Sequence, residues 1–336
     1  MPRIAFLSTA HIHTRDFIAN ILAASDGRQI AAIWDDTPER GQRYAAQAQT
    51  RFVEGGEGLE ALLADPGIDG FIICAENTRH LPLLQKTLPT GKPVFCEKPL
   101  VTGTNDLAAV RALLNGSPAP LFCGYFMPFS GEMQTIARLL EEGALGQVTR
   151  VSFVNAHHAA YGRWFDNPDL AWFHDAGLSG GGAFMDMGTH AIHLLRTLFG
   201  PVRQVWAEIG NHSGIYPEVD DYGVAHLRFA SGVLGHVEAA WTQTGGNEGL
   251  TVVGSEGAIW RTPEGYVIGR PGHTPEKIAP AGEVANRVDR LVEIIRGTIP
   301  AADLQADFAA ICDAVAIMEA AYRSASGGSW RSVERF

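Results

Sequence analysis

Three polar side chains, Asp186, His190 and His193, recur within an apolar stretch that follows a run of glycines. Asp186 and His190 are four positions apart and His193 is three further on, so a helix would place all three on one face. The ordinary pKa range of histidine suits a residue that takes and returns a proton near neutral pH. The spacing therefore predicts an acid/base role for His190, with Asp186 orienting it or binding a substrate hydroxyl.

Lys98 is the other residue that we expect to do chemistry. It stands in Glu97-Lys98-Pro99, directly after the apolar run 93–96. The carboxyl end of a strand is where ligands of parallel sheets bind, whereas a structural lysine more often lies on a helix surface. Pro99 restricts Lys98 to an extended backbone. The ammonium group can hold an oxyanion that forms during a reaction, or relay its proton.

Other interpretations of the helical face stay open. A histidine in an apolar helix is commonly a core residue with a satisfied hydrogen bond. Aspartate and histidine at helical spacing are also plausible metal ligands, and the sequence offers His157, His158 and His174 as further ligands. We predict the acid/base role and no metal. Tyr161, Trp164 and His193 are predicted to contact substrate, because aromatic faces suit the C–H surfaces of sugars.

The elements that must position Lys98 alternate along the first 123 residues. Apolar runs predict strands at 4–7, 29–34, 52–53, 70–74 and 93–96, and amphipathic stretches predict helices at 15–24, 38–47, 59–63 and 81–88. This alternation indicates βαβ units and a parallel sheet that is buried on both faces. Residues 1–123 are therefore expected to form a Rossmann dinucleotide-binding domain, whose ligand lies at the carboxyl ends of the strands.

The first strand-to-helix turn reads Ser8-Thr9-Ala10-His11-Ile12-His13 and holds no glycine. The dinucleotide fingerprint Gly-x-Gly-x-x-Gly is therefore missing, and a domain that has lost its nucleotide is one alternative. Binding of a pyrophosphate nevertheless requires only short side chains at the turn and hydrogen-bond donors near a helix N-terminus. Our predicted cofactor contacts are Ser8, Ala10, His11, Ile12, Asp35, Ala75, Asn77, His80, Glu97 and Lys98.

Asp35 follows the second strand, where an acid can accept the adenosine-ribose hydroxyls of NAD. A 2′-phosphate would meet Asp35 and Asp36 with no fixed cation nearby, so the sequence favours NAD over NADP. An aspartate that caps the following helix is the alternative interpretation.

Residues 124–336 show a different pattern, which predicts an α+β domain with a large, mainly antiparallel open sheet. Helices are expected at 135–142, 183–198, 287–296 and 306–324, and strands at 148–154, 204–209, 222–229, 233–241, 249–253, 258–262 and 266–268. Consecutive strands without helices between them pair antiparallel.

Composition sets the broad class of the protein. The 336 residues are 46% hydrophobic and carry a net charge of −11, with no run of Lys or Arg and no apolar stretch long enough to span a bilayer. We therefore expect no nucleic-acid or membrane partner. The four cysteines form no paired motif, and the N-terminus lacks a signal-peptide layout, so a cytoplasmic location is expected.

Two segments, 91–100 (GKPVFCEKPL) and 179–190 (SGGGAFMDMGTH), closely resemble signatures of the glucose–fructose oxidoreductase / inositol dehydrogenase / MocA family. Segments 141–148, 219–221 and 253–257 are also similar, so the resemblance covers nearly the whole chain. Three departures are the missing glycines, Gly124–Phe129 in place of an Asn-Arg-Arg-like segment, and His193 where the family usually has Asp. The segment 124–129 therefore predicts a more apolar pocket.

The resemblance implies an NAD(P)-linked oxidation of one carbinol on a sugar, cyclitol or related polyol by a homo-oligomer, a dimer or tetramer that packs its open sheets together. Such an oxidation needs a base for the hydroxyl proton and a cation near the forming alkoxide, which we assign to His190 and Lys98. Two alternatives are a glycosidase that oxidises, eliminates and re-reduces with a held NAD, and a redox-inactive sugar- or nucleotide-binding protein.

Overall fold

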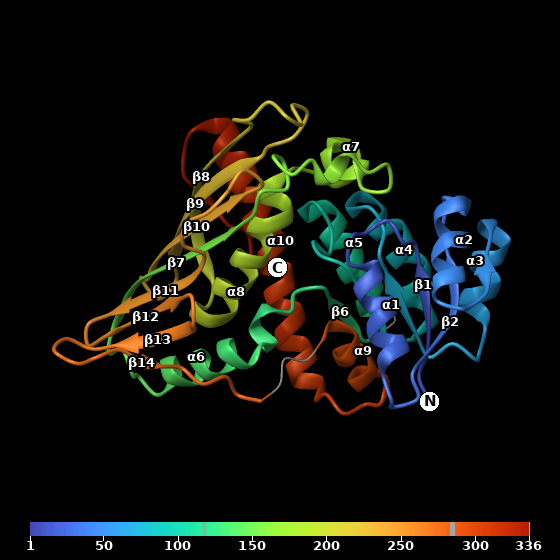
Figure 1. The fold of residues 1–336 in the computed structure, drawn as a ribbon, viewed down its shortest axis with the longest axis horizontal. Helices are drawn as coiled ribbons and strands as arrows, with labels where there is room; N and C mark the ends of the chain where they lie inside the picture. The colour runs from blue at the N-terminus through green and yellow to red at the C-terminus, as the bar shows by residue number, and fades with distance from the viewer. Residues whose placement is uncertain (117–118, 283–285, 336) are drawn as a thin grey trace. The chain divides into compact units, whose positions relative to one another are not determined.

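The computed structural model describes residues 1–116, 119–282 and 286–335, which form two compact units (Figure 1). The first unit combines Met1–Gly124, Phe165–Gly180 and Asn286–Ile311. The second combines Tyr125–Trp164, Gly181–Ala285 and Cys312–Phe336. The first crossing between units thus falls next to residue 123, and two later segments return to the first unit.

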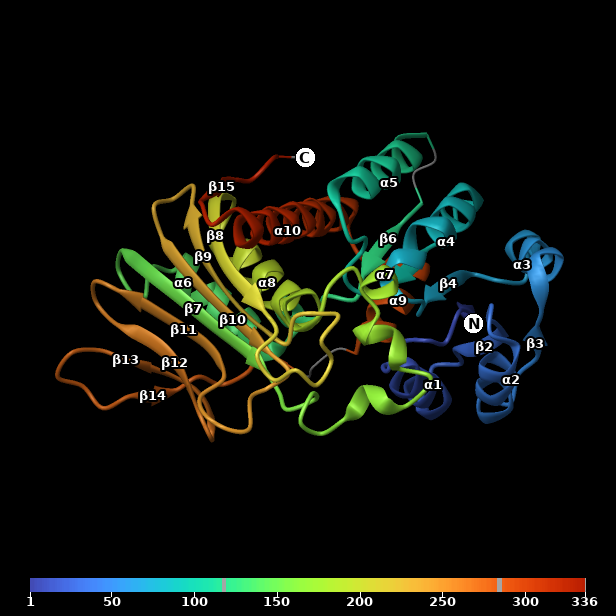
Figure 2. The ribbon, with the colours of Figure 1, turned by 90° about the horizontal axis from the view of Figure 1, so that it is seen from above.

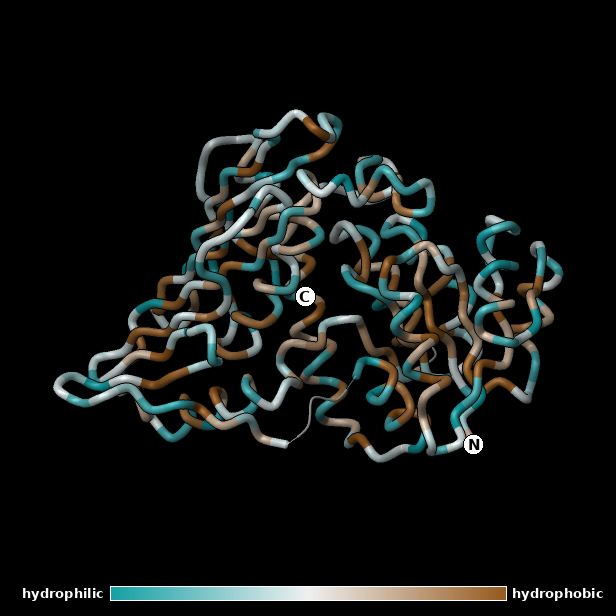
Figure 3. The backbone as a smooth tube through the Cα atoms, in the orientation of Figure 1, coloured by the Kyte–Doolittle hydropathy of each residue, from teal (hydrophilic) through white to brown (hydrophobic). Residues whose placement is uncertain are grey.

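The first unit is built on a six-stranded parallel sheet of order β3-β2-β1-β4-β5-β6. Its strands are β1 Arg3–Leu7, β2 Gln29–Trp34, β3 Phe52–Val53, β4 Gly70–Ile73, β5 Val94–Cys96 and β6 Leu121–Cys123. Helices cover both faces (Figures 1 and 2): α1 Thr14–Ala23, α2 Pro38–Gln47, α3 Gly55–Ala64, α4 His80–Thr87, α5 Thr104–Gly116 and α9 Arg287–Ile295. The central strands β1, from Ile4 on, and β4 are hydrophobic (Figure 3) and buried, in agreement with the predicted Rossmann-like sheet.

The second unit contains a nine-stranded sheet of order β14-β13-β12-β11-β7-β10-β9-β8-β15. Its strands are β7 Val148–Ala156, β8 Val202–Gly210, β9 Tyr222–Phe229, β10 Leu234–Ala240, β11 Gly249–Gly254, β12 Ala258–Thr262, β13 Gly265–Gly269, β14 Glu276–Lys277 and β15 Arg331–Ser332. Adjacent strands are antiparallel except β7 and β10, which are parallel. The mainly antiparallel sheet was therefore predicted correctly.

One face of this sheet is buried and the other is more exposed. Along β9, the side chains of Ala225, Leu227 and Phe229 are buried, whereas those of His226 and Arg228 are exposed. This period of two is typical of an antiparallel strand with one covered face. The helices of this unit are α6 Gly131–Glu141, α8 Thr189–Phe199 and the second part of α10 Ala301–Gly327. Within the described ranges, no helix is both long and apolar enough to cross a membrane.

Candidate functional site

The turn between β1 and α1 is tight although it holds no glycine. Ser8 has a φ of 66°, in the left-handed region that glycine adopts at the lowest cost. Its amide donates to the Trp34 carbonyl at 2.7 Å, and the His11 amide donates to the Cys74 carbonyl at 2.9 Å. The turn is therefore held between the ends of β2 and β4. It lies at the switch point of the strand order, between β1 and β4, where ligands of this fold bind.

Asp35 stands at the end of β2, as expected, but its carboxylate already accepts several hydrogen bonds within the unit. Its Oδ2 accepts from the amide and the hydroxyl of Thr9 at 2.8 and 2.5 Å. Its Oδ1 accepts from the Thr37 amide at 2.8 Å, and Arg40 of α2 donates to both oxygens at 3.0 and 2.8 Å. Asp35 thus fastens the first turn to α2, and its carboxylate is buried.

The expectation that no fixed cation lies near Asp35 and Asp36 is wrong. The side chain of Arg40 is only 7% exposed and lies 2.8 Å from Asp35 and 3.3 Å from Glu76, and Arg79 pairs with Asp36. Burial lowers the pKa of Arg40, but the hydrogen bonds and charges of Asp35 and Glu76 outweigh burial and raise it overall. The sequence did not reveal this network, because Glu76 comes from a different strand end.

Glu97, at the end of β5, is a fully buried carboxylate among nitrogen donors. Its Oε1 lies 3.0 Å from Nδ1 of His13 and 3.2 Å from Nη1 of Arg287, and its Oε2 accepts from the Lys98 amide at 3.0 Å. Burial acts to raise the pKa of Glu97, but the charges on His11, Arg287 and His13 hold it well below its usual range. Glu97 is therefore ionised and fixes the backbone at Lys98.

His11, His13 and Glu97 are, within the described part of the chain, the one group whose ligand atoms lie close enough for a single metal ion, 4.8 Å or less apart. However, Nη1 of Arg287 lies 3.0 Å from Nδ1 of His13, so a guanidinium already supplies positive charge there. Nδ1 of His11 lies 3.3 Å from the His13 amide, within hydrogen-bond distance of it. The cluster therefore fits a buried ion-pair network better than a metal site.

The segment 165–180 covers the first turn within the same unit. The indole Nε1 of Trp172 donates to the Ala10 carbonyl at 3.1 Å, and the His11 ring lies 5.6 Å from the ring of Phe173. Nδ2 of Asn77 donates to the Ser179 carbonyl at 2.8 Å. Three predicted cofactor contacts therefore touch this segment. These contacts were not predicted from the sequence, because they join residues about a hundred or more positions apart.

His80 links the loops that follow β4 and β5. Its Nδ1 lies 2.8 Å from the Pro99 carbonyl and its Nε2 lies 3.2 Å from the Ala75 carbonyl. The ring is fully buried, and burial lowers its pKa. His80 therefore holds the backbone next to Lys98, a residue that is only 3% exposed. Ile12, in contrast, is 37% exposed.

In the second unit, the predicted helix 183–198 is a π-helical turn, Phe184–Gly188, followed by α8. Asp220 holds its start, accepting from the amides of Phe184 and Gly182 at 2.7 and 2.8 Å and from the Tyr322 hydroxyl at 2.9 Å. A Cβ on Gly182 would lie 1.8 Å from the Asp220 carbonyl, so this position requires glycine. The glycine run thus allows a close backbone approach, and π-helical turns are frequent at functional sites.

Asp186 and His190 have well-defined neighbours in this unit. Oδ2 of Asp186 accepts from the indole Nε1 of Trp241 at 3.0 Å. The His190 ring lies edge-to-face with Tyr125 and Phe126, at centroid distances of 5.9 and 5.8 Å. The segment 124–129 therefore places aromatic rings beside the predicted acid/base residue. Trp241 as the partner of Asp186 was not identified from the sequence.

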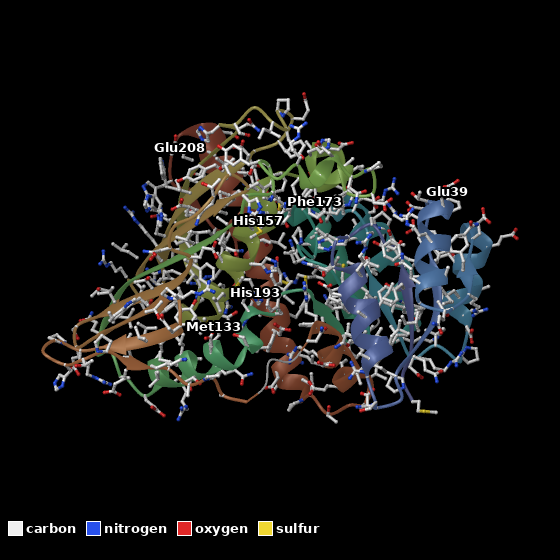
Figure 4. The ribbon with its side chains drawn as sticks, viewed as in Figure 1. Glu39, Met133, His157, Phe173, His193 and Glu208 are labelled. Carbon is white, nitrogen blue, oxygen red and sulfur yellow. The ribbon has the colours of Figure 1, made fainter. Side chains whose placement is uncertain are left out.

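His193, labelled in Figure 4, is buried in the core, and its ring lies next to the same tyrosine. Its ring stacks on Tyr125 at 4.2 Å with an interplanar angle of 7°, and it is 1% exposed. Burial, with a smaller effect of the Arg196 charge, lowers the pKa of His193 to about 3. His193 is therefore neutral at neutral pH and supports Tyr125, which is a neighbour of His190. The metal alternative gains no support, since in the described ranges Asp186, His190 and His193 do not form a group close enough for one ion.

We expect His193→Phe to flatten the acid side of the stability profile. The native ring cannot take a proton that the unfolded chain binds below about pH 6.5, so stability is lost as pH falls through that value. The loss attributable to His193 is about 2 kcal/mol at pH 5. Urea unfolding of wild type and variant at pH 7.5 and pH 5 measures it. The exposed His273→Gln serves as control, and an equal loss of stability in wild type and His193→Phe would contradict the assignment.

Family models match both units of the chain. "Oxidoreductase family, NAD-binding Rossmann fold" matches residues 3–125, and "GFO/IDH/MocA C-terminal domain" matches residues 133–260. The 1,5-anhydro-D-fructose reductase of Ensifer adhaerens is 24% identical, over 73% of this chain and 71% of its own length. The scyllo-inositol 2-dehydrogenase (NAD(+)) of Bacillus subtilis is 24% identical, over 72% and 68%. The crystal structure of aldose-aldose oxidoreductase from Caulobacter crescentus has the same fold, with a TM-score of 0.82 at 22% identity over 99% of this chain and 100% of that one.

Proposed function

The chain belongs to the GFO/IDH/MocA family of oxidoreductases, which has an NAD-binding Rossmann fold, and from this premise we propose its reaction. It transfers a hydride between NAD and a secondary alcohol of a sugar, cyclitol or related polyol. The observation that carries the proposal is the polar pair Asp186 and His190 on the π-turn and α8, with aromatic rings beside His190. Relatives named as sugar and cyclitol dehydrogenases or reductases support this reaction over a glycosidase or a redox-inactive binding protein.

The residues take separate roles in this proposal. Bound NAD⁺ supplies the hydride acceptor. His190 takes the hydroxyl proton and returns it in the reverse direction, and the Lys98 ammonium stabilises the negative charge that develops on the same oxygen. Asp186, held by Trp241, accepts a hydrogen bond from a substrate hydroxyl. His193 becomes a positioning residue, which differs from the substrate contact expected from the sequence.

The first turn fits a dinucleotide, since the left-handed Ser8 gives the backbone path that a glycine normally provides. Our proposed cofactor contacts on this side remain Ser8, Ala10, His11, Ile12 and Asp35. The loops after β4 and β5 contribute Ala75, Asn77, His80, Glu97 and Lys98. Several of these polar groups hold one another, so they shape the site as well as touching the ligand.

NAD is the proposed cofactor in preference to NADP. The reason is no longer that cations are absent near Asp35 and Asp36, but that carboxylates outnumber the guanidinium groups there. Asp35 and Asp36 after β2, together with Glu76 after β4, give three carboxylates against two guanidinium groups, those of Arg40 and Arg79. The surplus of negative charge disfavours a 2′-phosphate. The name of the Bacillus subtilis relative, which specifies NAD(+), also supports this choice.

A direct screen tests the proposed reaction. Purified protein is mixed with NAD⁺, and separately NADP⁺, and with inositols, aldoses, anhydro sugars and glycosides, while the absorbance of the reduced nicotinamide is followed. We expect reduction of NAD⁺ by a subset of polyols. The proposal is wrong if no alcohol reduces either nucleotide and the denatured protein releases no bound nucleotide.

We also propose a homo-oligomeric assembly and a cytoplasmic location. The uncovered face of the nine-stranded sheet carries Trp206 and His226, and Leu234 there is 57% exposed. Burying this face against a second copy would form a dimer, and two dimers would form a tetramer. A cytoplasmic location fits four cysteines that are all free and buried.

A further inference from the structure

The loop 157–164, which follows β7 in the second unit, exposes large aromatic side chains. Trp164 is 38% exposed and Tyr161, three positions earlier, is 53% exposed. In the same loop Ala159 and Ala160 are fully buried. Exposed aromatic surface that is not simply scattered commonly marks a binding site. We call the residues His157, His158, Tyr161 and Trp164 the aromatic ledge.

The ledge is presented by an ordered backbone. The amides of His157 and Ala160 donate to the carbonyls of Ala240 and Trp241 at 3.0 and 2.9 Å, and the Trp164 amide donates to the Ala159 carbonyl at 3.1 Å. Because the loop is already fixed by these bonds, a ligand that stacks on it would meet a small ordering cost.

Packing around the indole ring adds to this order. The His157 ring stacks on Trp164 at 4.8 Å with an angle of 28°, and the His158 ring meets it edge-on at 5.3 Å. A Cβ on Gly162 would lie 2.5 Å from the indole nitrogen, so the ring lies directly against the backbone. Figure 4 shows His157 among the side chains of this unit. The ledge thus combines an apolar face with imidazole groups that can bond hydroxyls.

Trp241 connects the aromatic ledge to Asp186, the carboxylate that we propose binds a substrate hydroxyl. Its backbone carbonyl accepts from Ala160 of the loop, and its indole donates to Asp186 at 3.0 Å. The ledge is also almost uncharged. Arg163 is the one Lys, Arg, Asp or Glu of 157–164, and its guanidinium lies over the ring of Tyr216 at 5.7 Å. A neutral ring therefore suits the ledge better than a phosphate or a carboxylate.

We propose that the aromatic ledge binds a second, neutral sugar ring, joined by a glycosidic bond to the ring that is oxidised. The substrate class is then a neutral disaccharide or larger glycoside, and not a free monosaccharide. The C–H face of a pyranose packs on the indole, and its hydroxyls meet the imidazoles. This inference rests on the proposed function for the ring that reacts, but the ledge itself is a binding site that can be tested without turnover.

The test compares cellobiose and maltose with glucose, in wild type and three variants. We expect a higher kcat/KM for a disaccharide than for glucose, and a fall of this ratio by about tenfold in Trp164→Ala. Trp164→Phe should keep most of the ratio. Trp330→Ala, which removes an indole of similar exposure (37%) in the same unit, should leave it unchanged. Saturation-transfer NMR of the same sugars reports binding independently of oxidation.

Each outcome decides the matter. A disaccharide preference in activity or NMR binding that Trp164→Ala abolishes supports the ledge. No preference for a disaccharide in wild type, or an unaltered preference in Trp164→Ala, overturns the proposed sugar site. Oxidation of glucose in the same assay would still support the proposed function. If no alcohol is oxidised but Trp164→Ala still loses disaccharide binding, the reaction fails and the ledge remains a sugar site.

Discussion

Replacing Lys98 or His190 by alanine is expected to lower turnover with the best polyol by about a hundredfold or more in each case. Lys98→Ala removes the cation that stabilises the developing alkoxide, and His190→Ala removes the acceptor of the hydroxyl proton. Steady-state rates at saturating NAD⁺ and polyol measure both effects. Glu97 keeps its hydrogen bond to the backbone of residue 98 in the first variant, so the local fold should survive.

Two exposed residues provide matched controls for these variants. Lys86, whose side chain is 47% exposed, pairs with Glu60, and Lys86→Ala should leave turnover within about twofold of wild type. His273→Ala should behave in the same way. Circular dichroism establishes that each variant is folded. Turnover close to wild type in a folded Lys98→Ala or His190→Ala would overturn the role of that residue.

Replacing Arg40 by methionine is expected to destabilise the first unit by about 3–5 kcal/mol. The substitution leaves Asp35, with a side chain 0% exposed, as a buried carboxylate without a guanidinium partner, and it leaves Glu76, 6% exposed, with only Arg79 at 3.8 Å. The amides of Thr9 and Thr37 still donate to Asp35, but they carry no full charge. Urea unfolding at pH 7.5 measures the change in free energy.

The neighbouring Arg43 on α2 is the control for this substitution. Its side chain is 46% exposed and pairs with Asp169, which is itself 32% exposed, so Arg43→Met should cost less than about 1 kcal/mol. Equal costs for the two variants would show that the Arg40 network contributes no more than a surface ion pair. Weaker NADH binding by folded Arg40→Met would add that the network also shapes the cofactor side.

Much of the fold is predictable because its elements depend on local periodicity. The strands β2, β9 and β12 and the helix α2 begin and end where apolar runs or amphipathic spacing placed them. Strand order then follows from right-handed βαβ connections. The helix α5 and the strand β6 were not identified, although both lie in the Rossmann domain.

The parts that could not be predicted depend on contacts between distant residues. The segment 165–180 joins the first unit through bonds such as Trp172 to Ala10, 162 positions apart. Arg287 reaches His13 from an even more distant part of the chain. The π-helical turn is held by Asp220, and no periodic pattern in the sequence predicts this contact. Such pairings leave no trace in composition or spacing.

The candidate site divides along the same line. Motif and spacing predict Lys98, Asp186 and His190 as candidate site residues, because each belongs to a short segment of distinctive type. The surroundings of the candidate residues could not be predicted from the sequence. Asp35, for example, is hydrogen-bonded to Arg40, and His193 is buried in the core. The predicted substrate contact of His193 stays a prediction, and its burial against Tyr125 is the reason that we propose a positioning role instead.

Transfer of deuterium from a labelled polyol to the nicotinamide ring is the most direct test of the account. Polyols that carry deuterium on their carbinol carbons are incubated with the protein and NAD⁺, the mixture is quenched with cold alkaline methanol, and free and released nucleotides are examined by mass spectrometry. We predict one deuterium in the reduced nicotinamide, and far less with His190→Ala. Consumption of a labelled polyol with no deuterium in any nucleotide would contradict hydride transfer by this protein.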